Sequence, residues 1–331
     1  MFTPQFIEEL WYGHHALSWL LLPLSWLYAG FALLLRAAYA IGILPVQRVS
    51  VPVIVVGNLT VGGTGKTPLV IWMADYLKQR GLHPGIVSRG YGGTAKQWPQ
   101  QVRPDSNPLT VGDEPVVIAR RTGCPVAISP NRYAAASELV QHTGCDIILC
   151  DDGLQHLELE RDLEIAVIDG VRQFGNGRCL PAGPLREPVS RLRSVDMIVG
   201  KGQAGKNQFL MEYTALRLQS LNRERPEYRE LETFAGKTVH AVAGIGNPST
   251  FFALLRSRGV QTIRHVFPDH HRYRPEELNF DDGLPVVMTE KDAVKCEGFA
   301  LPDMWFLPIQ AKMSNAFEHR FSILIQELQR G

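Results

Sequence analysis

The segment from Val51 to Pro68, VPVIVVGNLTVGGTGKTP, constrains the fold more than any other part of the chain. A β-branched apolar run leads into a glycine-rich turn, which is followed by Lys66, Thr67 and a helical pattern. This order is typical of a strand, loop and helix that bind phosphate, because glycines let successive backbone N–H groups point at one anion. The N-terminus of the following helix adds partial positive charge. The segment therefore predicts a nucleotide cradle.

In such a cradle, Lys66 reaches the β- and γ-phosphates of ATP and the Thr67 hydroxyl binds Mg²⁺. The strict pattern has glycine at the first loop position, where this chain has Thr60, so an ordinary glycine-rich turn before a helix is the alternative. The strand, the turn and GKT occur in the required order, which favours the cradle. The residues expected to contact the nucleotide are consecutive: Thr60, Val61, Gly62, Gly63, Thr64, Gly65, Lys66 and Thr67.

A second part of the nucleotide site is predicted within the sequence DIILCDDGLQH. Four apolar residues, 147–150, read as a buried strand that ends in Asp151 and Asp152. An aspartate at the tip of such a strand binds Mg²⁺ directly or through water. Gln155 and His156 follow on the same loop, where His156 is a ligand, a base or a structural residue.

Composition limits the class of protein. With 331 residues and 45% hydrophobic content, the chain can form two domains with a sizeable core. The net charge of +1 gives no reason to expect nucleic acid as a partner. The five cysteines form no CxxC pair, which fits a reducing compartment and argues against a disulfide framework or a structural zinc site.

Residues 16–35 carry no charge, and a helix of this length spans about 30 Å, enough to cross a bilayer. A signal peptide is disfavoured because Glu8 and Glu9 precede the run and no cleavage site follows. A spanning helix is possible, although Pro23 is expected to kink it. We favour a helix that lies in the membrane interface, with a buried core helix as the other alternative. The aromatic residues suited to the headgroup level are Trp19, Trp26 and Tyr28.

Alternating strand and helix patterns after the cradle predict an α/β fold. We expect a P-loop NTPase-like, largely parallel sheet with flanking helices, a smaller α/β domain and the apolar N-terminal helix. A polar, charge-rich stretch at 202–232 suggests the boundary. The expected divisions are therefore 1–48 for the membrane-associating region, 49–232 for the kinase core and 233–331 for the smaller domain. Whether the last helix packs on the core stays open.

The cradle sequence distinguishes among nucleotide-binding proteins. A Rossmann dehydrogenase has GxGxxG at the first turn, whereas this chain has GGTGKT. Partitioning ATPases often carry a second lysine where this chain has Val61, and the guanine-binding motif of GTPases does not match the spacing at 289–292. An ATP-using phosphotransferase or ATPase with a membrane-proximal N-terminus remains.

The motifs GNLTVGGTGKTP, SRGYGG, GDEP, NR, DDGLQH, DHH and TEKDAVK occur in this order behind the apolar segment. Together they resemble the tetraacyldisaccharide 4′-kinase family. The resemblance implies that Mg-ATP phosphorylates the 4′-hydroxyl of a tetraacylated glucosamine disaccharide 1-phosphate to give lipid IVA, in lipid A biosynthesis. It also implies a peripheral or monotopic location at the cytoplasmic face of the bacterial inner membrane, with no nucleic acid and no obligate protein partner.

The resemblance also implies roles for individual residues. The catalytic aspartate is Asp113 of GDEP, although from the residues alone Asp113 reads as a helix cap. It acts with a histidine of the DHH motif, for which we prefer His270 over His271, and with Lys66. The metal ligands implied are Thr67, Asp151 and Asp152. The residues implied to contact lipid or phosphate are Tyr91, Arg132, Gln155, Arg186 and Glu187.

Two other functions remain as alternatives at this point. A membrane-associated P-loop ATPase switch would recruit or move a partner without modifying a lipid, and it would need no base to activate a hydroxyl. A soluble kinase for a small polar substrate would carry residues 16–35 as a core helix.

Overall fold

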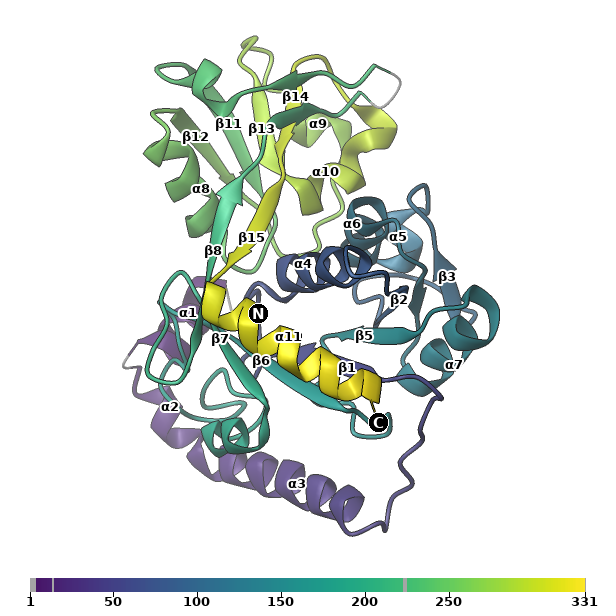
Figure 1. Ribbon diagram of the computed structural model, residues 1–331. Coiled ribbons are helices and arrows are strands. Elements are labelled where there is room, and N and C mark those ends of the chain that lie inside the picture. Colours follow the sequence, from purple (N-terminus) through teal and green to yellow (C-terminus); the bar gives the residue numbers. More distant parts are fainter. Residues whose placement is uncertain (1–3, 14, 223–224, 331) are drawn as a thin grey trace.

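The computed structural model describes residues 4–13, 15–222 and 225–330, which form two α/β units in contact with each other (Figure 1). In these residues the larger unit contains a nine-stranded sheet that is parallel except for the strand at each edge. Its strands, in order across the sheet, are β15 (Ile309–Met313), β8 (Phe209–Ala215), β7 (Met197–Lys201), β6 (Leu163–Asp169), β1 (Val53–Gly57), β5 (Ile147–Asp151), β2 (Pro84–Ser88), β4 (Val126–Ile128) and β3 (Gln100–Val102).

Helices cover both faces of this sheet, because β1 buries side chains on both sides. Ile54 and Val56 pack into the core formed with α4, α6 and α11, whereas Val53 and Val55 pack on the opposite face with α7. The helical segments of the larger unit are α4 (Lys66–Lys78), α5 (Pro108–Val111), α6 (Asp113–Thr122), α7 (Arg132–Thr143), the 3₁₀ helix η1 (Val189–Ser194) and α11 (Asn315–Arg330). The predicted α/β fold with a largely parallel sheet is confirmed.

The central position of β1 decides where the site lies. β1 pairs in parallel with β5 on one side and with β6 on the other, and Val56 is in register with Asp151. The cradle therefore leaves the sheet at the same carboxyl edge as the aspartate pair. This edge is where open α/β sheets bind ligands.

The smaller unit has a six-stranded sheet within the described residues, flanked by short helices. Its strands, in order, are β10 (Tyr228–Arg229), β9 (Leu218–Ser220), β14 (Met304–Leu307), β13 (Val286–Thr289), β11 (Thr238–Ala243) and β12 (Gln261–Val266). Its helical segments are η2 (Leu231–Phe234), α8 (Pro248–Ser257), α9 (Pro275–Leu278), α10 (Glu290–Cys296) and η3 (Glu297–Phe299).

The expected boundary at residue 232 needs correction. The strands β9 and β10 precede this residue and pair within the smaller sheet, whereas β15 and α11 return to the larger unit. The smaller unit therefore extends from about residue 216 to about residue 308. The polar stretch that suggested the boundary contains the short edge strand β10, and charged residues are common on such edges.

The apolar N-terminal segment forms α1 (Pro4–Tyr12), α2 (Leu17–Leu20) and α3 (Leu22–Ala40), which run along one side of the larger unit (Figure 1). Pro23 does not kink a long helix as expected, because it lies in the first turn of α3, where proline is tolerated. Only 6% of the apolar stretch of α3 is buried, so the alternative prediction of a buried core helix is wrong. By length and composition, α3 is sufficient to cross a membrane.

The side of this segment that faces the protein carries serines, whereas the side that faces outward is apolar. Ser18 and Ser25 face the protein, where Ser25 donates a hydrogen bond to the carbonyl of Cys179. Tyr28, expected at the headgroup level, instead packs against the buried cluster that includes Leu59. The outward side chains are large and apolar: Trp19, Leu20, Leu24, Trp26, Leu27, Phe31, Leu33 and Leu34.

Candidate active site

The glycine-rich turn joins β1 to α4 as the sequence predicts. Gly65 precedes α4 with a φ of +97°, and a side chain at this position would collide with the Tyr213 hydroxyl. Gly62 also has a positive φ, in open space. The backbone N–H of Val61 donates to the carbonyl of Pro184 at 2.8 Å, which fixes the start of the cradle. Only glycine at residue 65 allows this turn to enter the helix.

Lys66 lies in the cradle between two oxygen acceptors. Its Nζ is 3.3 Å from the Asn58 side-chain oxygen and 3.4 Å from Asp152 Oδ1. Asp152 also contacts Arg186 at 3.1 Å. Burial alone would raise the pKa of Asp152, but the charges of Lys66 and Arg186 outweigh it and hold the pKa at about 2. Asp152 thus carries a constant negative charge that holds these two cations together.

Asp151 has a different environment from its neighbour. Burial, followed by the charge of Glu114, raises the pKa of Asp151 to about 7. Its Oδ1 is buried and has no hydrogen-bond partner among the described residues, and the same is true of the Thr64 hydroxyl. A divalent cation would satisfy the carboxylate oxygen, so the donor chemistry fits Mg²⁺. Within the described residues no three acidic, His or Cys side chains converge on a metal, so its other ligands would be hydroxyl, water and phosphate oxygens.

Arg132 also has buried polar atoms without a partner among the described residues. It is only 2% exposed, and its Nη1 donates to the carbonyl of Ser129. Its Nε and Nη2 are buried without a partner among the described residues. Burial lowers the pKa of His156 to about 4, and the nearby charges of Arg132 and Arg89 add to this effect. His156 is therefore neutral in a cationic pocket that would favour an anion.

Asp113 and His270 meet across the two units. Asp113 begins α6, and its Oδ1 is 3.0 Å from His270 Nδ1. Burial alone would raise the pKa of Asp113, but the hydrogen bond from His270 and the charge of Lys291 outweigh it and lower the pKa. Burial likewise opposes the charged form of His270, whose pKa is nevertheless raised, chiefly by the hydrogen bond to Asp113.

The structure separates the two adjacent histidines. His270 contacts Asp113, whereas His271 Nε2 lies 3.1 Å from Glu277 within its own unit. The expected capping role of Asp113 is modified, because Gly112 is the N-cap, and among the backbone N–H groups of the described residues the Asp113 carboxylate accepts that of its neighbour Glu114.

Residues 17–326 match the family model described as tetraacyldisaccharide-1-P 4′-kinase. The chain belongs to the tetraacyldisaccharide 4′-kinase family. Proteins of that name from Nitrosococcus oceani and Alkalilimnicola ehrlichii are 49% and 52% identical to it, covering 97% and 92% of this chain and 94% and 92% of theirs.

A solved member of the tetraacyldisaccharide 4′-kinase family has the same fold. The crystal structure of LpxK from Aquifex aeolicus in complex with ATP aligns with a TM-score of 0.78 at 30% identity, covering 94% of this chain and 99% of that one. ATP as the nucleotide is therefore supported. Family membership does not favour the alternative of an ATPase switch.

Three of the residues that the resemblance assigned to the substrate of this kinase family, Gln155, Arg186 and Glu187, lie together beside the cradle. Gln155 donates to Glu187 at 2.9 Å and to the carbonyl of Asn58 at 3.1 Å, and Arg186 contacts Gln155 and Asp152. Tyr91 lies apart from them, 63% exposed, with its ring 4.9 Å from that of His270.

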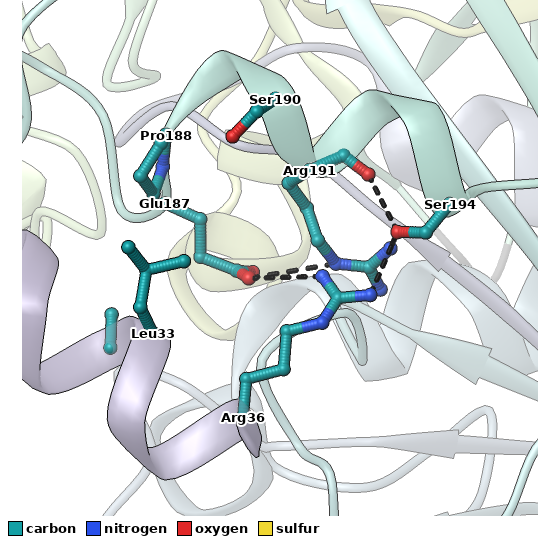
Figure 2. Close-up of a pocket in the computed structure, with 8 residues that line it drawn as sticks. Leu33, Arg36, Glu187, Pro188, Ser190, Arg191 and Ser194 are labelled. Carbon is teal, nitrogen blue, oxygen red and sulfur yellow. Dashed lines mark hydrogen bonds and ion pairs between the residues drawn. The ribbon is translucent and has the colours of Figure 1, made fainter. Parts of the chain in front are cut away.

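Glu187 also connects this side of the site to the apolar helix of the kinase. Figure 2 shows its carboxylate beside Arg36 of α3 and Arg191 of η1, in a pocket that Leu33 and Pro188 also line. Arg36 Nη1 is 3.8 Å from Glu187, and Arg36 Nη2 donates to Ser194 at 2.7 Å. The helix end is thus joined to the site by polar contacts.

Sequence reasoning missed several residues of the site. Asn58 contacts Lys66 although it precedes the glycine-rich turn. From the smaller unit, Lys295 contacts Asp113, and Lys291 pairs with the adjacent Glu114. The TEKDAVK motif was the available signal for the two lysines, but nothing in its spacing indicates a partner more than 170 residues earlier in the chain.

Proposed function

We propose that this chain transfers the γ-phosphoryl group of ATP to the 4′-hydroxyl of a tetraacylated glucosamine disaccharide 1-phosphate, giving lipid IVA, with Asp113 and His270 as the proton-accepting pair. The observation that carries the assignment of roles is the 3.0 Å contact between these side chains from two units. A sugar hydroxyl is a weak nucleophile near neutral pH, and a positioned base contributes about 10²- to 10⁴-fold. An ATPase switch modifies no sugar hydroxyl, so it would not need a base to activate one.

The cradle residues 60–67 would hold the nucleotide phosphates through backbone N–H groups, and Lys66 would neutralise the developing charge. Thr67 and Asp151 would hold Mg²⁺, which supplies further charge neutralisation when bound. Asp152, the third expected ligand, is engaged with Lys66 and Arg186, so its role would be to position these cations.

Contacts to the lipid are proposed for the residues that surround this centre. The unpartnered Nε and Nη2 of Arg132 suit a phosphate, because a guanidinium binds two anionic oxygens at once. Tyr91 would contact the sugar beside His270, and Gln155, Arg186 and Glu187 would line the approach from α3. Because the base combines residues of both units, it would be complete only when they are in contact, which would limit ATP hydrolysis without lipid.

The direct test of this function is γ-phosphate transfer from labelled ATP to purified tetraacyldisaccharide 1-phosphate in detergent micelles. Labelled lipid that depends on Mg²⁺ is the expected result. ATP hydrolysis without labelled lipid would contradict the kinase and favour the ATPase switch.

We propose that α2 and α3 lie in the cytoplasmic interface of the inner membrane. The outward apolar side chains and the inward serines support this placement. Changing Trp26, Leu27 and Leu34 together to Ser should weaken cosedimentation with anionic vesicles by at least about 100-fold, since each buried side chain contributes about 1.5–3 kcal/mol. The melting temperature should hardly change, because all three are exposed.

The matched control for this variant replaces exposed apolar residues of the smaller unit, Tyr228, Ile263 and Val266, by Ser. This control should cosediment like the wild type. Equal vesicle binding by both triple variants would show that α3 is not the membrane-binding element.

The raised pKa of Asp151 predicts a pH dependence for Mg²⁺ binding. A metal-binding carboxylate must lose its proton, so with a pKa of about 7 the apparent affinity should fall as the pH drops below 7, by up to about tenfold per unit. Calorimetric titration of Mg²⁺ in the presence of a non-hydrolysable ATP analogue measures this slope. Asp151→Asn should bind more weakly and lose the part of the slope that the protein contributes. An equal slope in both proteins would contradict the assignment.

A further inference from the structure

The helix α10 of the smaller unit packs against α6 and brings a buried lysine to the Asp113 carboxylate. Lys295 Nζ is 3.6 Å from Asp113 Oδ2 and 2.8 Å from Asp292 Oδ1. The Lys295 side chain is only 3% exposed. A buried ammonium group requires anionic partners, so these two carboxylates account for its position.

Asp292 is itself held by two hydrogen bonds besides its contact with Lys295. It is fully buried, at 0% exposure, and it accepts hydrogen bonds from the backbone of Gly244 at 2.9 Å and from the Thr289 hydroxyl at 2.6 Å. A Cβ on Gly244 would lie 2.6 Å from the Tyr273 hydroxyl, so the backbone can approach only without a side chain. These hydrogen bonds fix the Asp292 carboxylate independently of Lys295, and the carboxylate in turn fixes the Lys295 ammonium group.

The charges near Asp113 divide according to the unit that supplies them. His270, Lys291 and Lys295 all come from the smaller unit. Glu114 is the charged neighbour on α6 itself, and it pairs with Lys291 at 3.1 Å. Asp269 pairs with the same lysine at 3.0 Å, and Arg272 lines the small pocket that Asp113, His270 and Lys295 share. The larger unit alone would therefore leave Asp113 beside another carboxylate and without its cations.

We propose that Lys295, held by Asp292, is a positioning residue that keeps the Asp113 carboxylate charged and directed at His270. This inference rests on the proposed function, in which Asp113 and His270 accept the substrate proton. The smaller unit then contributes more than a histidine, because its helix α10 also determines whether Asp113 is a competent base.

The test removes the buried ion pair without leaving an unpaired charge, in the double variant Asp292→Asn and Lys295→Met. Replacement of both partners of a buried pair by neutral groups of similar size is often tolerated. Loss of an opposite charge at this distance raises a carboxyl pKa by about one to three units. Asp292 contacts Lys295 and is not among the charges that act most on Asp113, so its loss offsets only part of this rise. The acid limb of kcat/KM for lipid phosphorylation, measured from about pH 5 to about pH 10, should therefore move to higher pH.

Two further variants distinguish charge from packing. Lys295→Arg keeps the cation, so its acid limb should stay near that of the wild type. Arg121→Met with Glu290→Gln removes another ion pair between α6 and α10, at 2.9 Å, that does not contact Asp113. This control should lower stability to a similar extent without moving the acid limb. Melting temperatures with bound ATP analogue report whether each variant is folded.

The outcomes distinguish a failure of the Lys295 role from a failure of the proposed base. If Asp113→Asn abolishes lipid phosphorylation while the folded double variant has an unchanged acid limb, the role of Lys295 is wrong and the proposed base stands. If Asp113→Asn retains full activity, the proposed base fails regardless of Lys295. If the control pair moves the acid limb as far as the double variant does, the effect is one of docking and the inference is overturned.

Discussion

Asp113→Asn should lower the rate of lipid phosphorylation by about 10²- to 10⁴-fold, the usual contribution of a general base. Asn has nearly the same size as Asp but cannot accept a proton, and it leaves Lys66 and the cradle untouched. Binding of ATP should therefore stay within a few-fold of the wild type. Initial rates of labelled phosphate transfer, with ATP affinity measured in parallel, test both statements.

The matched control for this prediction uses the two adjacent histidines. His270→Asn should reduce the rate in the same direction, because His270 is the partner of Asp113. His271→Asn should keep nearly full activity, since that ring contacts Glu277. Equal losses in both histidine variants would mean that the loop, and not the Asp113 pair, is required.

Lys66→Met should lower kcat/KM by about 10²- to 10³-fold, comparable to the loss of one donor that stabilises a transition state. The ammonium of Lys66 lies between Asn58 and Asp152, so its loss removes a cation from the expected position of the transferred phosphate. Steady-state kinetics with varied ATP measure the effect.

Lys78→Met is the matched control on the same helix α4. Lys78 pairs with Asp75 at the far end of that helix, and its side chain is about as exposed as its partner's. The Lys78→Met variant should phosphorylate lipid at nearly the wild-type rate. A loss of less than about tenfold in Lys66→Met, or equal losses in both variants, would contradict the role of Lys66.

Local sequence predicted the parts of the site that depend on neighbours along the chain. The order of strand, glycines and Lys66 determines the cradle, because the positive φ at Gly65 and the start of α4 follow from adjacent residues. The aspartate pair was also placed correctly at the end of β5, since an apolar strand and its polar tip are local patterns.

Features that depend on distant contacts could not be predicted in this way. His270 and His271 are adjacent and chemically identical, and only their contacts with Asp113 and Glu277 separate them. The inward orientation of Tyr28 depends on a cluster around Leu59 and Cys179, which no periodicity in the apolar segment encodes. The end of the larger unit was misplaced for the same reason, because β15 pairs with a strand far earlier in the chain.

The pairing of β8 with β15 makes the smaller unit an insertion within the larger one. Ala215 and Ile309 are register neighbours in antiparallel strands, so a tight hairpin turn could join them in place of residues 216–308. The chain that remains after this deletion would keep Phe317 and Phe321 of α11 in the core of the larger unit. A chain shortened from its C-terminus would lose them first, so the terminal segment supports the nucleotide-binding unit and not the domain that precedes it in sequence.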